Sequence, residues 1–186
     1  MGTPQRATPT VTGGLAYAEV ALPGALIGVA AGAFGAGTAA LAGLPLPLIL
    51  TITAGLGVPL ALAGGCYCVL LALGRLRIGA VAPAALYWAV AFPAARLVEE
   101  TAMAWYLGQA TLLREPLWSF LLFQAMLSVG YAIGFLWLHE RLAPRWLLAT
   151  SGHNPVAGDL AGRYLRHLEV MSRRRAPAAT GRRGNG

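Results

Sequence analysis

The residues of this chain with the clearest capacity for chemistry are three ions, Arg96, Glu99 and Glu100, set in a largely apolar stretch. Spacings of three and four residues would place Arg96 beside either carboxylate on one face of a helix. Inside a membrane bundle, such a cluster would serve as a proton relay or a substrate contact. At the membrane boundary, Arg96 would instead extend its long side chain toward the headgroups. The choice depends on where the apolar segments begin and end.

The composition indicates a membrane protein, because 57% of the residues are hydrophobic and 11% are charged, against about 25% charged in soluble domains. A helix needs about 20 apolar residues to cross the hydrocarbon core, and four runs reach that length. Backbone polar groups must be satisfied within each segment in lipid. The sequence therefore predicts an all-α integral membrane protein, a bundle of four transmembrane helices plus a cytoplasmic amphipathic helix. The predicted spans are about 23–44, 48–73, 78–98 and 116–138.

The predicted spans divide the chain into four parts. The first residues are rich in Thr, Pro and Gly, and the last are rich in Ala, Pro, Gly and Arg, compositions typical of segments without a packed core. We predict a flexible leader, a four-helix transmembrane domain, a cytoplasmic tail at the membrane interface and a disordered basic C-terminus, over residues 1–14, 15–140, 141–175 and 176–186 respectively.

The arginines predict the orientation, because basic residues near helix ends stay on the cytoplasmic side. With four crossings, only Arg96 and Arg114 of the 14 basic residues fall on the outer face. We therefore expect both termini in the cytoplasm and the 99–115 loop outside. Every basic residue is Arg, and Ala and Gly are abundant, which indicates a GC-rich codon supply. Such a codon supply favours a bacterial source, and we therefore expect the plasma membrane of a bacterium as the location.

This topology places Glu99 and Glu100 in the outer loop, just beyond the third span. The following residues, 101–113, are too few to cross the membrane and include Trp105 and Tyr106. We expect them to form a short amphipathic helix in the outer interface. The alternative is a long, tilted third helix that draws the ion cluster into the bundle.

Small residues recur every four positions in the predicted spans, which lets helix backbones approach closely in lipid. We predict packing within the chain, with self-association through an exposed stripe as the alternative. The predicted helix-packing residues are Gly24, Gly28, Gly32, Gly57, Gly65, Gly130 and Gly134.

Two further groups of reactive residues have simple structural interpretations. Cys66 and Cys68 lie two positions apart, about 200° around a helix, so we expect inert core residues and not a redox pair. His139 is expected at the cytoplasmic rim, with the next residue, Glu140, pairing with Arg75 or Arg77.

The Glu99–Glu100 pair and the F-x-x-x-H string at 135–139 resemble, in outline, two motifs of the CAAX-type intramembrane metalloproteases. The resemblance implies metal-assisted hydrolysis using Glu99, Glu100 and His139. It covers about a dozen residues. Ala104 stands where the family has arginine, and the sequence has no fifth hydrophobic segment to carry the family's last histidine motif.

The tail after the fourth span has the pattern of a basic amphipathic helix. Asn154 and Pro155 suit a helix start, and apolar residues follow at spacings of three and four. Such a helix lies on anionic lipid headgroups or docks onto a partner, whereas nucleic-acid binding is disfavoured. The predicted membrane-surface residues are Trp146, Arg163, Arg166, Arg173, Arg174 and Arg175.

Together these patterns favour a non-catalytic accessory or scaffold subunit that associates with the lipid bilayer and with homo- or hetero-oligomeric membrane partners. A small transporter or channel component using Arg96, Glu99 and Glu100 is the first alternative. An intramembrane enzyme of unrecognised type is the second. The sequence predicts no catalytic residue, cofactor or metal, and without lysine it has no Gly-Lys-Ser loop for nucleotide phosphates.

Overall fold

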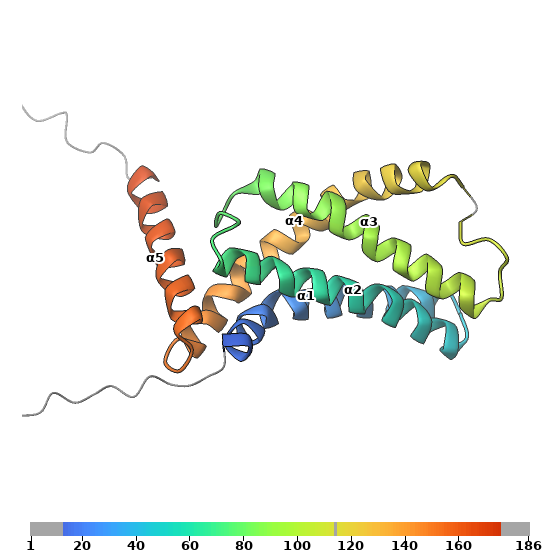
Figure 1. Cartoon of the computed structure of the whole chain (residues 1–186), viewed down its shortest axis with the longest axis horizontal. Helices are drawn as coiled ribbons and strands as arrows, with labels where there is room; N and C mark the ends of the chain where they lie inside the picture. The colour runs from blue at the N-terminus through green and yellow to red at the C-terminus, as the bar shows by residue number, and fades with distance from the viewer. Residues whose placement is uncertain (1–12, 114, 176–186) are drawn as a thin grey trace, which may run out of the picture.

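The computed structural model describes residues 13–113 and 115–175, and these residues form five α-helices and no strand (Figure 1). The first four helices are long and apolar enough to cross a membrane, which confirms the predicted helical class and the count of four candidate spans. The leader and the basic C-terminus lie mostly outside the described residues. The helices are α1 Gly13–Leu41, α2 Leu46–Ala72, α3 Val81–Tyr106, α4 Leu117–Thr150 and α5 Pro155–Arg175.

Helices α1 to α4 run along the length of the molecule, and α5 crosses one end of the bundle (Figure 1). The most extensive contact joins α1 to α2. Smaller contacts join α2 to α3, α3 to α4, and α4 back to α1, while α5 touches α4, α1 and α2. The chain is therefore a four-helix bundle closed at one end by a transverse helix.

Helix α3 is longer than its predicted span of 78–98, since it continues to Tyr106. The hydroxyl of Thr101 donates to Leu97 O at 2.8 Å, and Arg96 contacts Glu99 and Glu100. Residues three and four positions apart are neighbours on the surface of a helix. The helix ends where Gly108 takes a positive φ of 61°. Residues 101–106 thus extend the third helix instead of forming a separate interfacial one.

Helices α1 and α4 also extend beyond their predicted spans. Pro23 lies inside α1, ten residues after its start, and Pro144 lies inside α4. The predicted first span, 23–44, begins at Pro23, and proline is well tolerated at the start of a helix. A proline inside a helix removes one backbone hydrogen bond and tends to kink the helix, yet both helices continue through it. The tail residues 141–150, expected at the interface, are therefore the last turns of α4.

Helices α1 and α2 meet backbone to backbone through glycine. A Cβ added at Gly24 would stand 2.0 Å from Gly64 O, and one at Gly28 would stand 2.3 Å from Ala61 N. One at Gly32 would stand 2.6 Å from the Cα of Gly57. No side chain fits at such distances, so glycine is required for the two helices to approach this closely.

The remaining predicted packing glycines differ from one another. Gly65 faces Ala21 of α1, with 3.4 Å between its added Cβ and the Ala21 Cβ. Gly130 and Gly134 of α4 have open space where a Cβ would stand. The expectation that these two pack within the chain is wrong, because they lie on the face of α4 turned away from the other helices.

Aromatic rings fill the middle of the bundle between α2, α3 and α4. Trp88 is fully buried, and its ring centroid lies 4.5 Å from that of Phe135 and 4.7 Å from that of Tyr131. Tyr67 of α2 meets Phe135 edge-on at 5.2 Å. We call Tyr67, Trp88, Tyr131 and Phe135 the aromatic layer.

Candidate functional site

The ion cluster lies inside α3 and not in a loop beyond it. Arg96 Nη1 pairs with Glu99 Oε2, and Arg96 Nη2 donates to Glu100 Oε1 at 3.0 Å. The structure therefore brings the three predicted residues together. It contains the long third helix that was the alternative prediction. The expected position of both glutamates in an outer loop is wrong, because the helical contacts of Arg96 continue α3 past them.

Burial of Glu99 depends on a glycine of the neighbouring helix. Glu99 is 7% exposed, and a Cβ added at Gly55 of α2 would stand 3.2 Å from the Glu99 Cα. The missing side chain at Gly55 lets α3 approach α2 at this point. A carboxylate removed from water needs a charged partner, and Arg96 supplies it. The Arg96–Glu99 ion pair thus offsets the cost of burying the Glu99 carboxylate where α2 and α3 meet.

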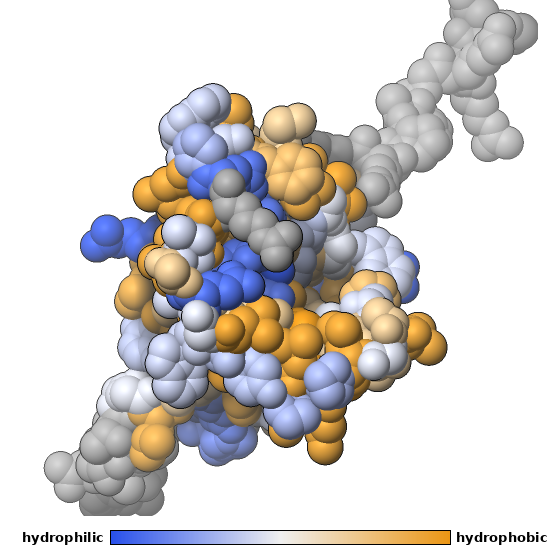
Figure 2. Space-filling model, turned by 90° about the vertical axis from the view of Figure 1, so that its right-hand side faces the viewer, coloured by the Kyte–Doolittle hydropathy of each residue, from blue (hydrophilic) through white to orange (hydrophobic). Residues whose placement is uncertain are grey.

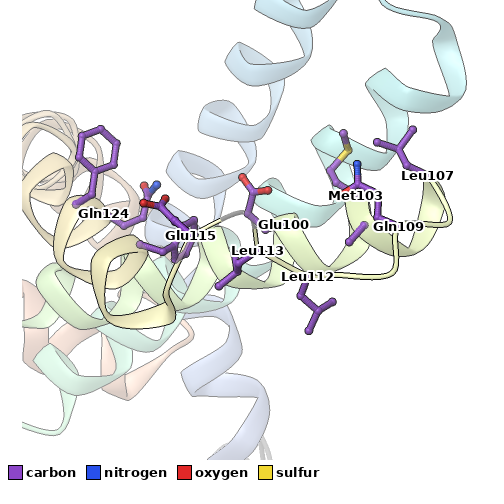
Figure 3. A pocket seen from close by; sticks show the side chains of 11 residues that line it. Glu100, Met103, Leu107, Gln109, Leu112, Leu113, Glu115 and Gln124 are labelled. Carbon is purple, nitrogen blue, oxygen red and sulfur yellow. The ribbon is translucent and has the colours of Figure 1, made fainter.

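A pocket of about 410 Å³ opens beside the cluster, between the end of α3, the α3–α4 connection and the start of α4. Glu100, Gln109, Glu115 and Gln124 provide its polar groups (Figure 3). The other lining side chains are apolar, and they are Met103, Ala104, Leu107, Leu112, Leu113, Phe120 and Phe123. The pocket therefore combines acidic groups with a hydrophobic wall, at the end of the bundle away from α5.

Exposed aromatic side chains surround this end of the bundle. Trp105 is 85% exposed, Tyr106 42% and Trp118 70%. Figure 2 shows the same end, where hydrophilic residues gather near the middle with hydrophobic ones around them. Tryptophan and tyrosine in such positions are typical of the level of the lipid headgroups.

The structure does not bring the metalloprotease-like motifs together. Glu99 packs against Gly55 of α2, whereas His139 lies beside Cys68 of the same helix. Positions 55 and 68 are about 20 Å apart along a helix that rises 1.5 Å per residue. Within residues 13–113 and 115–175, no three His, Cys, Asp or Glu side chains form a group that could hold a metal ion.

His139 is a buried residue and not the rim residue that the sequence suggested. It is 2% exposed, its Nε2 lies 3.2 Å from Cys68 Sγ, and its ring meets Tyr67 edge-on at 5.4 Å. Glu140, expected to pair with Arg75 or Arg77, is exposed, and none of the ion pairs among the described residues contains it. The four-residue spacing from Phe135 was the signal that could have placed His139 on the inner face of α4.

Residues at the opposite end tie α5 to the bundle. Asn154 caps α5 through Oδ1, which accepts from Val156 N at 2.9 Å and Ala157 N at 3.1 Å. Its Nδ2 donates to Glu19 Oε2 at 2.8 Å and to Ala16 O at 2.9 Å. Trp146 Nε1 donates to Glu19 O at 3.0 Å. Trp146 is therefore held partly buried against α1, and its predicted place at the membrane surface stays a prediction.

The apolar face of α5 is partly covered by the chain itself. Leu160 and Tyr164 are buried against the bundle, and this burial raises the pKa of the Tyr164 phenol. Arg163 donates to Ala72 O at 2.6 Å, so it caps the end of α2, and its predicted contact with the membrane surface stays a prediction. Arg166 and Arg173 are exposed, while the side chains of Arg174 and Arg175 lie outside the described residues.

Comparison with protein-family models, curated proteins and solved structures finds no match for this chain.

Proposed function

We propose that the chain is a multi-pass protein of a bacterial plasma membrane, with both termini in the cytoplasm, that serves as a non-catalytic accessory or scaffold subunit. The four long apolar helices support the multi-pass arrangement. The excess of arginine at the α5 end and in the tail supports the orientation. Partners would be other helices of the same membrane.

Transport through the bundle is less well supported, because aromatic rings pack between α3 and α4 beyond the ion cluster. Along α3 and α4, the pocket beside Glu100 is followed by Trp88, Tyr131 and Phe135, whose rings pack at 4.5 to 6.2 Å between centroids. Arg96 is already paired with both glutamates. The cluster is thus positioned to hold helices together and to border a pocket at one end.

The observation that carries the proposal is the open glycine face of α4. Gly24, Gly28 and Gly32 of α1 pack against α2, but a Cβ added at Gly130 or Gly134 would have no other described helix within 4 Å. They lie on a face with Ile133, 64% exposed, and Trp137, 56% exposed. Small residues on an open face let a second helix approach closely in lipid. We propose this face of α4, defined by Gly130, Ile133, Gly134 and Trp137, as the surface for a partner helix.

The outward side of α5 suits a membrane surface. Leu165, Leu168 and Met171 remain exposed there, next to Arg166 and Arg173. The helix lies across the bundle axis (Figure 1), which would place it along the headgroups if the bundle stands upright in the bilayer. Exposed apolar residues with arginine support contact with anionic lipid.

A pull-down in mild detergent with mass spectrometry tests the accessory role. The full chain carries the double substitution Gly130→Ile and Gly134→Ile, and the control carries Gly37→Ile, at another open glycine of α1. Partners recovered with the unchanged chain should be lost from the double variant and kept by the control. Identical partners in all three samples would contradict a role for the α4 face.

A further inference from the structure

We propose that the pocket at the α3–α4 end binds the ammonium group of an amphiphile, with the alkyl chain against the apolar wall. This site is separate from the α4 face proposed above for a partner helix.

Among the described residues that line the pocket, Glu100 and Glu115 contribute carboxylates. Arg96 Nη2 donates to one oxygen of Glu100, Oε1, at 3.0 Å, and Arg96 also pairs with Glu99. Glu115 Oε2 accepts from Ser119 Oγ at 3.3 Å. Ionised carboxylates only accept hydrogen bonds, whereas an ammonium group only donates them. A positively charged donor therefore matches the two carboxylates that line the pocket.

Gln124 gives independent evidence for a missing polar partner. Its side chain lines the pocket and is 5% exposed, yet its Oε1 has no hydrogen-bond partner within the described residues. Buried polar atoms in proteins are nearly always paired. A polar ligand in the pocket would supply the missing partner.

The size and the walls of the pocket favour an organic cation over a metal ion. A volume of about 410 Å³ lies in the usual range of small-molecule sites, which are mainly apolar with a few placed polar groups. Leu113, Phe120 and Phe123 form part of the apolar wall. A metal ion would need more oxygen or nitrogen ligands, and the described residues offer no group of three.

The exposed tryptophans near the pocket indicate where such a cation comes from. Trp105 and Trp118 lie exposed around the same end, as expected of residues at the lipid headgroups. The ammonium of phosphatidylethanolamine lies at that level and is joined through phosphate and glycerol to the acyl chains. A soluble alkylamine has the same chemistry and is the second source.

Calorimetry on the full chain in a neutral maltoside detergent tests the site, with octylamine as the probe and octanol as its uncharged equivalent. Heats of injection into protein-free micelles are subtracted from both. Octylamine should bind and octanol should not. Glu100→Gln and Glu115→Gln should each weaken octylamine binding by about tenfold, since each removes a charge-assisted contact, while Glu169→Gln, at an exposed carboxylate of α5, should leave it unchanged.

Equal binding of octylamine and octanol, or unchanged binding in both pocket variants, would overturn the proposal. Size-exclusion chromatography and circular dichroism check that the variants fold. If a variant does not fold, carbodiimide modification of the unchanged chain gives a second measurement by mass spectrometry. N,N-dimethyloctylamine, a tertiary amine that cannot form an amide with an activated carboxylate, should protect Glu100 and Glu115 from modification but not Glu169, and absence of that protection would equally overturn the site.

Nanodiscs distinguish the two sources of the ammonium group. The full chain is reconstituted in phosphatidylglycerol mixed with phosphatidylcholine or with the same share of phosphatidylethanolamine, so that the surface charge is equal, and octylamine is titrated into each. Weaker octylamine binding in the presence of phosphatidylethanolamine identifies the lipid as the occupant. Equal binding in both identifies a soluble amine.

Discussion

Helices α1 and α2 approach one another through glycine, whereas aromatic rings lie between α3 and α4. In the first pair the backbones are so close that a Cβ at Gly24 would stand 2.0 Å from Gly64 O. In the second pair Trp88, Tyr131 and Phe135 fill the space between the helices. At these glycines there is no room for a side chain between the two helix backbones. Between α3 and α4, a cavity can form beyond the last of these rings. The pocket beside Glu100 lies there.

The largest expected effect is at the glycine contact. Gly28→Ile would place a Cβ 2.3 Å from Ala61 N, against backbone that has no side chain to move aside. We expect the free energy of unfolding to fall by more than about 3 kcal/mol, beyond the usual cost of an oversized core residue. Unfolding in mixed micelles by titration with SDS measures the change. Gly37→Ile is the control, and equal losses in both would show that the α1–α2 contact does not depend on glycine.

Removal of the central ring of the aromatic layer should have a smaller but still large effect. Trp88 is fully buried, so Trp88→Ala should lower the free energy of unfolding by about 3 kcal/mol through the cavity that it leaves. Trp105→Ala removes an 85% exposed ring from the same helix and serves as the control. A loss at Trp88 no larger than that at Trp105 would contradict the importance of the layer.

The α2–α3 contact near Glu99 allows a test of the ion cluster. Arg96→Met leaves a buried carboxylate without its charged partner, and we expect a loss of about 2 kcal/mol, reduced from the fully buried case because the Arg96 side chain is 24% exposed. Adding Glu99→Leu removes that carboxylate and should recover most of the loss. The same SDS titration measures both variants. A double variant as unstable as the single one would mean that Arg96 acts through its packing and not through its charge.

The smallest expected effect sharpens the contrast between the two kinds of glycine. Gly134 has open space around its Cβ position, so Gly134→Ile should change the free energy of unfolding by less than about 0.5 kcal/mol, as for other surface positions. The measurement is made beside Gly28→Ile under the same conditions. A loss like that of Gly28→Ile would show that the α4 face is packed within the chain.

Sequence patterns predicted much of the architecture because they depend on local and averaged properties. Four apolar runs of sufficient length predicted four long helices, and α1 to α4 correspond to them. Asn154 before Pro155 predicted the start of α5, and Asn154 Oδ1 accepts from the first turn as a cap should. The helix ends were harder to predict. Hydropathy falls at the first charges of a segment, but α3 continues through Arg96 and Glu100 to Tyr106.

The candidate site likewise combines contacts that the sequence predicted with surroundings that it did not predict. The spacing of Arg96, Glu99 and Glu100 predicted that they would meet on one helix, and they do. Their surroundings involve residues far away in the sequence. Gly55 sets how deeply Glu99 is buried, and Gln124 completes the pocket from another helix. No local pattern links these positions.

By itself, the sequence determined the number of long apolar helices, the pairing of the three ions and the cap of α5, because each follows from hydrophobicity or spacing along one segment. Only the tertiary structure decided which glycines are used within the chain, that His139 lies beside Cys68, and that a pocket opens at the α3–α4 end. These features depend on which helix faces which and at what distance. The size and shape of side chains on neighbouring helices set those distances, from glycine between α1 and α2 to aromatic rings between α3 and α4.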